Sequence, residues 1–125
     1  MPKVSKESAA QVDDHGIVED RHEDIDGYTV NFVSFRTDVD ASPLLKGLPD
    51  DRCPCPHWGY VLKGRLTYRF SDHDETFAAG DAFYLPAGHV PVAEAGSEIL
   101  QFSPAAELRE VDAVMMKNVQ AMQQA

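Results

Sequence analysis

One short segment places three potential metal ligands at alternate positions. Cys53, Cys55 and His57 are separated by single prolines, Pro54 and Pro56. Proline holds φ at about −65° and keeps a chain extended, and residues i and i+2 of an extended chain lie on one side. We therefore expect the two sulfurs and the imidazole to face the same way.

These ligand types favour a particular class of metal. Thiolate and imidazole are the ligands that Zn²⁺ prefers in proteins, with iron or nickel as alternatives, whereas magnesium and calcium prefer oxygen. A disulfide between Cys53 and Cys55 would close a very small strained ring, so we expect two thiols. A pair of ordinary buried thiols or an intermolecular link stays open as an alternative.

A second segment, residues 80–91, supplies a fourth potential ligand. It reads GDAFYLPAGHVP, which is a turn, a strand, a Pro/Gly turn, and then His89 at the start of another strand. The sequence has no nucleophile elbow, no phosphate-binding loop and no dinucleotide fingerprint. Serine hydrolases, kinases and nicotinamide enzymes therefore lose support.

The elements that must position these side chains are short strands. From residue 28 the sequence alternates β-branched and aromatic runs with turn signals spaced as in antiparallel sandwiches and barrels. The clearest alternation is at Leu66, Tyr68 and Phe70, which should share one buried face. The predicted strands are residues 28–36, 57–63, 65–70, 75–78, 82–85, 90–94 and 98–102.

The two ends of the chain differ from this middle part. Ser103 and Pro104 suit the N-cap and first turn of a helix, and apolar residues then recur at helical spacing. Residues 1–26 carry many charges and few large apolar side chains, which favours a flexible acidic arm. An arm that docks on a partner subunit is the alternative.

The strand pattern and the two segments resemble the cupin superfamily. Gly80, Pro86 and Gly88 stand at the spacing of the second cupin motif, and YVLKG at 60–64 resembles the end of the first. The resemblance covers roughly residues 28–102. It implies an all-β fold, a cupin-type jelly-roll β-barrel with a short C-terminal α-helix.

The expected domain organisation follows from these observations. Residues 1–26 would form the arm, 27–103 the cupin β-barrel and 104–125 the C-terminal helix.

Cupins bind a divalent metal through three histidines and a glutamate, so the resemblance implies a metal centre with altered ligands. Aligned from the first glycine of the first motif, Cys53 and Cys55 occupy two histidine positions. Aligned from its last glycine, His57 occupies the glutamate position and Asp51 a histidine position.

The second motif is altered as well. Its histidine position holds Pro91, and His89 precedes that position by two residues, on the same face of a strand. The expected metal ligands are therefore Cys53, Cys55, His57 and His89. The further pocket candidates are Asp51, Tyr60, Tyr68 and Tyr84. A barrel that has lost its metal, with these groups simply buried, remains the alternative.

Two functions stay open at this point. One is a metal-dependent enzyme that acts on a small organic acid or related metabolite. The other is a non-catalytic cupin that binds or senses a small molecule, with a structural metal or none. A zinc site with four protein ligands would favour the second function, because it leaves no coordination position open.

Charge and hydropathy limit the partners. The formal net charge of −10 and the absence of a basic cluster disfavour nucleic acid and anionic membrane surfaces. Without a long apolar run or a secretory h-region we expect a cytoplasmic protein. The apolar stripe of the C-terminal helix and the open strand edges predict a homodimer.

Overall fold

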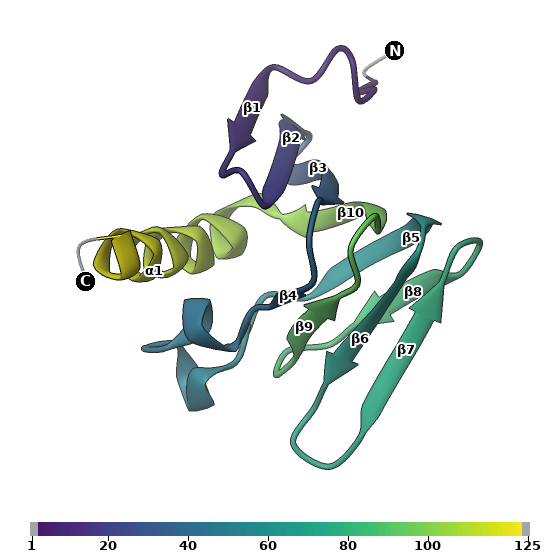
Figure 1. The fold of residues 1–125 in the computed structure, drawn as a ribbon. Coiled ribbons are helices and arrows are strands. Elements are labelled where there is room, and N and C mark those ends of the chain that lie inside the picture. The colour runs from purple at the N-terminus through teal and green to yellow at the C-terminus, as the bar shows by residue number, and fades with distance from the viewer. Residues whose placement is uncertain (1–2, 124–125) are drawn as a thin grey trace.

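Two antiparallel sheets face each other in the computed structural model, which describes residues 3–123 (Figure 1). The larger sheet has, in spatial order, β1 (Gln11–Asp14), β2 (Val18–Ile25), β3 (Tyr28–Phe35), β10 (Glu98–Pro104), β5 (His57–Lys63) and β8 (Ala82–Leu85). The smaller sheet has β4 (Val39–Asp40), β9 (Val90–Ala93), β6 (Arg65–Arg69) and β7 (Asp74–Ala78). The sheets are hydrogen-bonded separately, and their order is that of a jelly roll.

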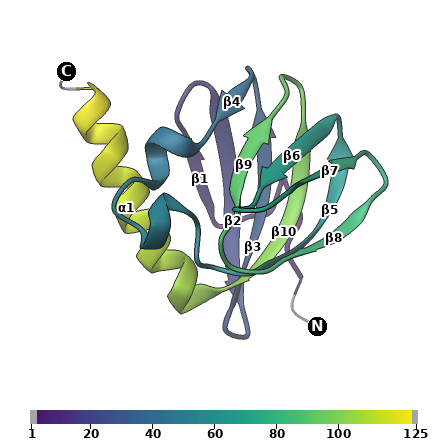
Figure 2. The same cartoon turned by 90° about the horizontal axis from the view of Figure 1, so that it is seen from below.

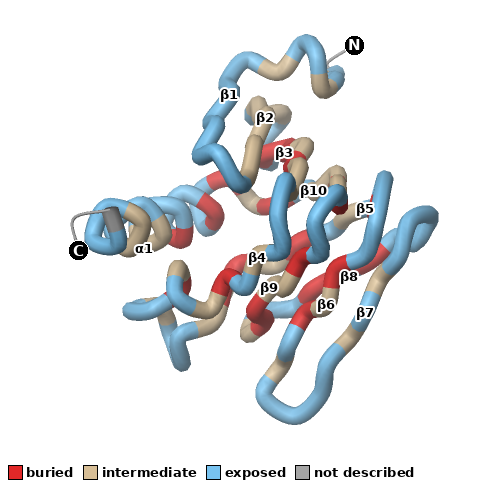
Figure 3. Tube along the Cα trace, in the orientation of Figure 1, coloured by how far each residue is buried: buried red, intermediate tan, exposed pale blue. Residues whose placement is uncertain are grey.

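The main core lies between the two sheets. On β6, Leu66 and Tyr68 are buried whereas Arg65 and Arg69 are exposed, which confirms the predicted alternation. Figure 3 shows buried positions along β3, β10, β6 and β8, whereas β1 is exposed and β7 has no buried position. The members of this core are Val33, Val61, Leu66, Tyr68, Phe83, Leu85, Ala93 and Ile99.

A single helix, α1 (Ala105–Gln123), follows the last strand and lies beside the open end of the sheet sandwich (Figure 2). Leu108 and Val111 pack in a second core cluster with Leu45 of the short 3-10 helix η1 (Ser42–Leu45). The Asn118 amide nitrogen donates to the carbonyl oxygens of residues 44 and 46, which secures this contact.

The start of α1 differs from the sequence prediction. Ser103 and Pro104 belong to β10, where they pair with Thr29 and Tyr28 of β3. The Ser103 hydroxyl bonds to His57 rather than capping the helix. A second 3-10 helix, η2 (Pro49–Asp51), lies in the connection before β5.

The flexible arm expected over residues 1–26 is wrong for residues 11–25. β2 pairs with β3 along its whole length, from Val18 opposite Phe35 to Ile25 opposite Tyr28, and β1 pairs with β2. Apolar burial alone would not order this segment. Backbone pairing satisfies its polar groups, and charged side chains such as Asp14 and Glu19 are held in ion pairs.

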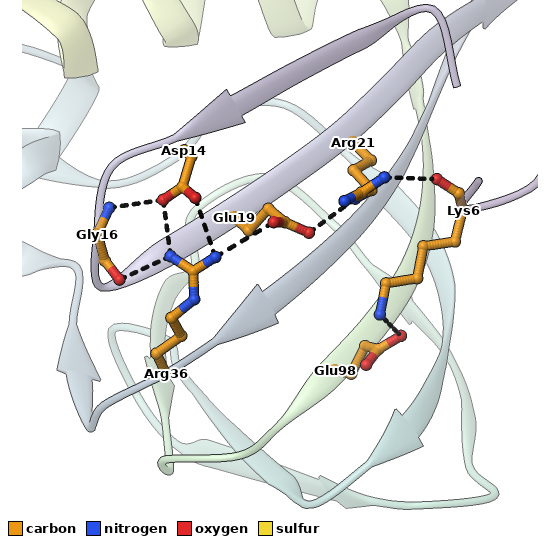
Figure 4. Close-up of polar contacts among 7 residues, drawn as sticks. All are labelled: Lys6, Asp14, Gly16, Glu19, Arg21, Arg36 and Glu98. Atoms are coloured by element: carbon orange, nitrogen blue, oxygen red, sulfur yellow. Dashed lines mark hydrogen bonds and ion pairs between the residues drawn. The ribbon is translucent and has the colours of Figure 1, made fainter. Parts of the chain in front are cut away.

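Ion pairs join these N-terminal strands to the rest of the fold (Figure 4). Arg36 donates to the Asp14 carboxylate at 2.6 and 3.0 Å and to Glu19 at 3.2 Å. Arg21 donates to Glu19 at 2.7 Å. An exposed pair contributes little alone, but Arg36, which follows β3, contacts Asp14 of β1 and Glu19 of β2 and so links both strands to β3.

No helix within residues 3–123 combines the length and apolar character that crossing a bilayer requires.

Candidate metal centre

Three buried side chains from different parts of the chain meet at one end of the core. Cys53 lies in the connection before β5, His57 is the first residue of β5, and His89 directly precedes β9. Their ligand atoms all lie within 4.8 Å of one another. The Cys53 N–H donates to the His89 carbonyl oxygen at 2.9 Å, and the Gly88 N–H donates to the Cys53 carbonyl oxygen at 2.8 Å. These two bonds hold the two segments side by side.

Hydrogen bonds orient both imidazoles. His89 Nδ1 lies 2.9 Å from the carbonyl oxygen of Pro86, which can only accept, so Nδ1 carries the hydrogen and Nε2 has a free lone pair. His57 Nδ1 lies 2.6 Å from the Ser103 hydroxyl, and its Nε2 lies 3.7 Å from Cys53 Sγ. Such outer partners fix the ring orientation of metal-binding histidines.

One distance in the cluster is close to that of a tetrahedral metal site. Zinc–sulfur and zinc–nitrogen bonds of about 2.3 and 2.0 Å at tetrahedral angles place neighbouring ligands about 3.3–3.6 Å apart. The distance from Cys53 Sγ to His57 Nε2 is 3.7 Å, and the three ligand atoms all lie within 4.8 Å of one another. The donor set of one thiol and two imidazoles fits a divalent ion of the zinc type, on which these atoms would draw closer together.

Burial controls the protonation of these groups. It raises the pKa of the Cys53 thiol to about 11 and lowers the pKa of His57 to about 3, with the nearby His89 adding to the second effect. Burial also lowers the pKa of His89. The two imidazoles are thus neutral at pH 7, which is the form that binds a metal.

The cluster lies in the wall of a cavity of about 510 Å³ between the sheets and α1. Tyr68 also lines this cavity, and its ring packs edge-on against His89. β2, β3 and β10 contribute the polar side chains of Asp20, Asn31 and Gln101 to the wall. The cluster therefore faces a space large enough for a small organic molecule.

Cys55 does not join the other expected ligands. It is fully buried, but its sulfur lies 3.5 Å from the Pro56 carbonyl oxygen, and it packs with Leu45, Val90 and Leu108. The backbone bends at Cys55, so the alternation that we expected from an extended segment is interrupted there. The structure brings together three of the four expected ligands.

The four further pocket candidates differ in whether they line the cavity. Tyr60 and Tyr84 are exposed on the outer face of the larger sheet and do not line the cavity. Asp51 is also exposed, and its carboxylate accepts from the Gly47 N–H at 3.0 Å. Tyr68 alone among the four lines the cavity.

Sequence reasoning missed three polar residues of this region. Ser103 was interpreted as a helix cap, and Asp20 as part of a mobile arm. Asn31 lies in a strand of apolar and polar residues without a clear alternation. One feature of the sequence could have indicated Asn31. It is an asparagine among the apolar strand residues Val30 and Val33, and a buried amide needs hydrogen-bond partners.

The sequence matches no protein-family model and no curated protein. Solved structures do resemble it. The polyketide cyclase RemF from Streptomyces resistomycificus has a TM-score of 0.60 at 14% identity, covering 83% of this chain and 79% of that one. KdgF from a Halomonas species has a TM-score of 0.54 at 23% identity, covering 75% and 86%.

A third structure is a protein from Shewanella frigidimarina described as an RmlC-like cupin. Its TM-score is 0.54 at 16% identity, covering 75% of this chain and 83% of that chain. At identities this low the likeness concerns the arrangement of the strands, and each of these activities belongs to the protein that carries it.

Proposed function

Because the chain has the cupin fold, we propose that it is a metal-dependent cupin that binds a small metabolite beside Cys53, His57 and His89. One observation carries this proposal. Three oriented ligand atoms gather in the wall of a cavity of about 510 Å³. The metal and the metabolite would therefore share one space.

The number of ligands supports a reactive site over a structural one. Structural zinc sites in proteins use four protein ligands, whereas catalytic sites use three and leave one position open. Cys55 is the fourth ligand that the sequence offered, and its sulfur contacts a backbone carbonyl instead. The open position would face the cavity and its ligand.

Zinc is the ion that we propose, with iron or nickel as alternatives. One thiolate and two imidazoles suit Zn²⁺ among common ions. A zinc ion bound here would supply Lewis-acid polarisation of a ligand oxygen. The protein's own contributions are the orientation of His57 by Ser103, the orientation of His89 by Pro86, and the edge-on packing of the Tyr68 ring against His89.

The two cysteines provide a matched test. We expect untagged wild-type protein and Cys55→Ser to contain about one metal per chain by elemental analysis, and Cys53→Ser to lose it, because Cys53 is the one cysteine in the proposed ligand set. With Co²⁺ in place of the native ion, the thiolate charge-transfer band should persist in Cys55→Ser and disappear in Cys53→Ser.

The same cobalt protein tests whether a coordination position is open. Addition of azide or thiocyanate should change the ligand-field spectrum if the fourth position exchanges. An unchanged spectrum would favour the closed, structural site of a non-catalytic binding protein. Wild-type protein without metal above background would contradict the proposal as a whole.

A further inference from the structure

The polar side of the cavity bears on which metabolite binds there. Resting on the metabolite-binding role proposed above, we infer that the ligand carries a protonated amine on an apolar skeleton. The amine would be held by the Asn31 side-chain oxygen and the carboxylates of Asp20 and Asp112. This inference replaces the organic acid expected from the sequence.

Asn31 supplies an acceptor without a partner. The residue is 3% exposed and lines the cavity from β3. Its amide nitrogen donates to both carboxylate oxygens of Asp20, at 3.0 and 3.1 Å, which fixes the orientation of the amide. Its Oδ1 is the one buried side-chain polar atom within residues 3–123 that has no hydrogen-bond partner. A buried, unpaired acceptor of this kind is costly and calls for a donor from a ligand.

The charged side chains around the cavity favour a ligand that carries a positive charge. Asp13, Asp20 and Asp112 line it, whereas the lining includes no lysine or arginine from the described part of the chain. Histidines also line it, and burial keeps His57 and His89 neutral at pH 7. A carboxylate would find no lysine or arginine among these residues, whereas an ammonium group would find the opposite charge of the three aspartates.

The aspartates themselves would gain from such a ligand. Burial raises the pKa of Asp20, and burial together with the nearby Asp20 raises that of Asp112 to about 6. Both shifts are in the direction expected where a negative charge is disfavoured. A bound cation would offset that cost, because an opposite charge stabilises an ionised carboxyl group.

The rest of the lining is apolar and sets the form of the skeleton. Side chains that contribute include Val33, Leu45, Ile99, Leu108, Val111 and Met115. β10 separates Asn31 on β3 from His57 on β5. The register places Asn31 level with Gly59, two residues along β5 from His57. Two strand spacings and two residues along a strand together amount to about 12 Å between backbones, which is an upper bound on the length of a ligand that reaches from Asn31 to the metal cluster.

Three probes of one skeleton test the sign of the charge. They are 3-phenylpropylamine, 3-phenylpropan-1-ol and 3-phenylpropionate, titrated calorimetrically into zinc-loaded and chelator-treated protein. We expect the amine to bind at least about tenfold more tightly than the alcohol or the acid, since hydrogen bonds to a charged donor are the stronger ones. The preference should persist without zinc, which excludes direct coordination of the amine as its cause.

Two variants test the residues. Asn31→Leu should abolish the preference for the amine. Asp112→Asn, which replaces an exposed carboxylate by a group of the same shape, should weaken the amine severalfold and leave the alcohol unchanged. The second variant is informative even if the first fails to fold.

The outcomes separate this inference from the proposed function. Equal or tighter binding of 3-phenylpropionate overturns the inference, as does an amine preference that survives both substitutions. Protein that binds zinc but none of the amine overturns the inference and leaves the metal proposal standing. Protein that binds the amine through Asn31 but takes up no metal supports the inference and overturns the metal proposal.

Discussion

The imidazole of His57 and the hydroxyl of Ser103 are 2.6 Å apart, although 46 positions separate them in the sequence. Both residues lie on neighbouring strands, His57 at the start of β5 and Ser103 near the end of β10. The bond directs His57 Nε2 toward the Cys53 sulfur. Strand pairing therefore decides which nitrogen of His57 a metal would meet.

Removing this hydroxyl should weaken the metal site without disturbing the fold. We expect Ser103→Ala to lower metal affinity about 10- to 100-fold, as the loss of outer hydrogen-bond partners does in other metal sites. Competition with a chromophoric chelator measures the change. Thr76→Ala, which removes an exposed hydroxyl on β7, should have no effect and serves as the control. Equal affinities of Ser103→Ala and wild type would show that Ser103 does not orient a ligand.

Arg36 should control the attachment of β1. Its guanidinium contacts the Asp14 carboxylate, Glu19 and the Gly16 carbonyl oxygen. In Arg36→Gln we expect backbone amides of residues 11–17 to exchange hydrogen severalfold faster, with β2 and β3 unchanged, because local opening follows local contacts. Exchange monitored by mass spectrometry tests this, with Arg69→Gln as the control. Faster exchange throughout the sheet would mean that the pairs stabilise the whole fold.

Asp112 should make stability depend on pH. Its pKa is raised from 3.8 to about 6 in the folded protein, so the folded state binds the proton more tightly than the unfolded state. This contribution to stability is present below about pH 4 and is lost as pH rises through 6. Asp112→Asn should therefore be more stable than wild type at pH 7.5 and equal to it near pH 4.

The gain should be small, less than about 1 kcal/mol, because the residue is exposed and solvent screens its charge. Thermal melts of both proteins between pH 4 and pH 8 measure the difference. Asp74→Asn, on the exposed hairpin strand β7, is the control for loss of a surface charge. A gain that does not vary with pH would contradict the assignment to Asp112.

The homodimer remains a prediction, and the structure offers a surface for it that the sequence did not single out. Tyr84, Trp58 and Phe102 lie opposite one another across β8, β5 and β10 and are 51%, 43% and 41% exposed. Contiguous exposed aromatic surface of this kind marks interaction sites. We expect Tyr84→Glu to convert a dimer into a monomer, measured by light scattering.

A variant of the helix separates the two candidate surfaces. Met122→Glu changes an exposed residue of α1, the element from which the dimer was first expected, and should leave the dimer intact. A monomeric wild-type protein at micromolar concentration would contradict the dimer itself. If Met122→Glu dissociates the dimer and Tyr84→Glu does not, the interface is formed by α1.

Much of the fold could be predicted because its signals are local. The alternation around Leu66 and Tyr68 and the turn residues Gly80 and Gly88 act within a few residues of chain, and the strands form where they indicate. The N-terminal strands carry no such signal. β2 is charged, and it is a strand because β3 pairs with it and because Asp20 on its inward side meets the Asn31 amide at the cavity.

The candidate site also has features that the sequence predicts and features that only the tertiary structure decides. The sequence by itself determined the ligand types, since the thiols and imidazoles near Cys53 and His89 already favoured zinc. Tertiary structure decided the set: a bend turned Cys55 away, strand pairing brought Ser103 to His57, and the N-terminal strands brought Asp20 to Asn31. The chemical types of side chains are fixed by the sequence alone, whereas ligand number, orientation and cavity charge depend on contacts between residues far apart in it.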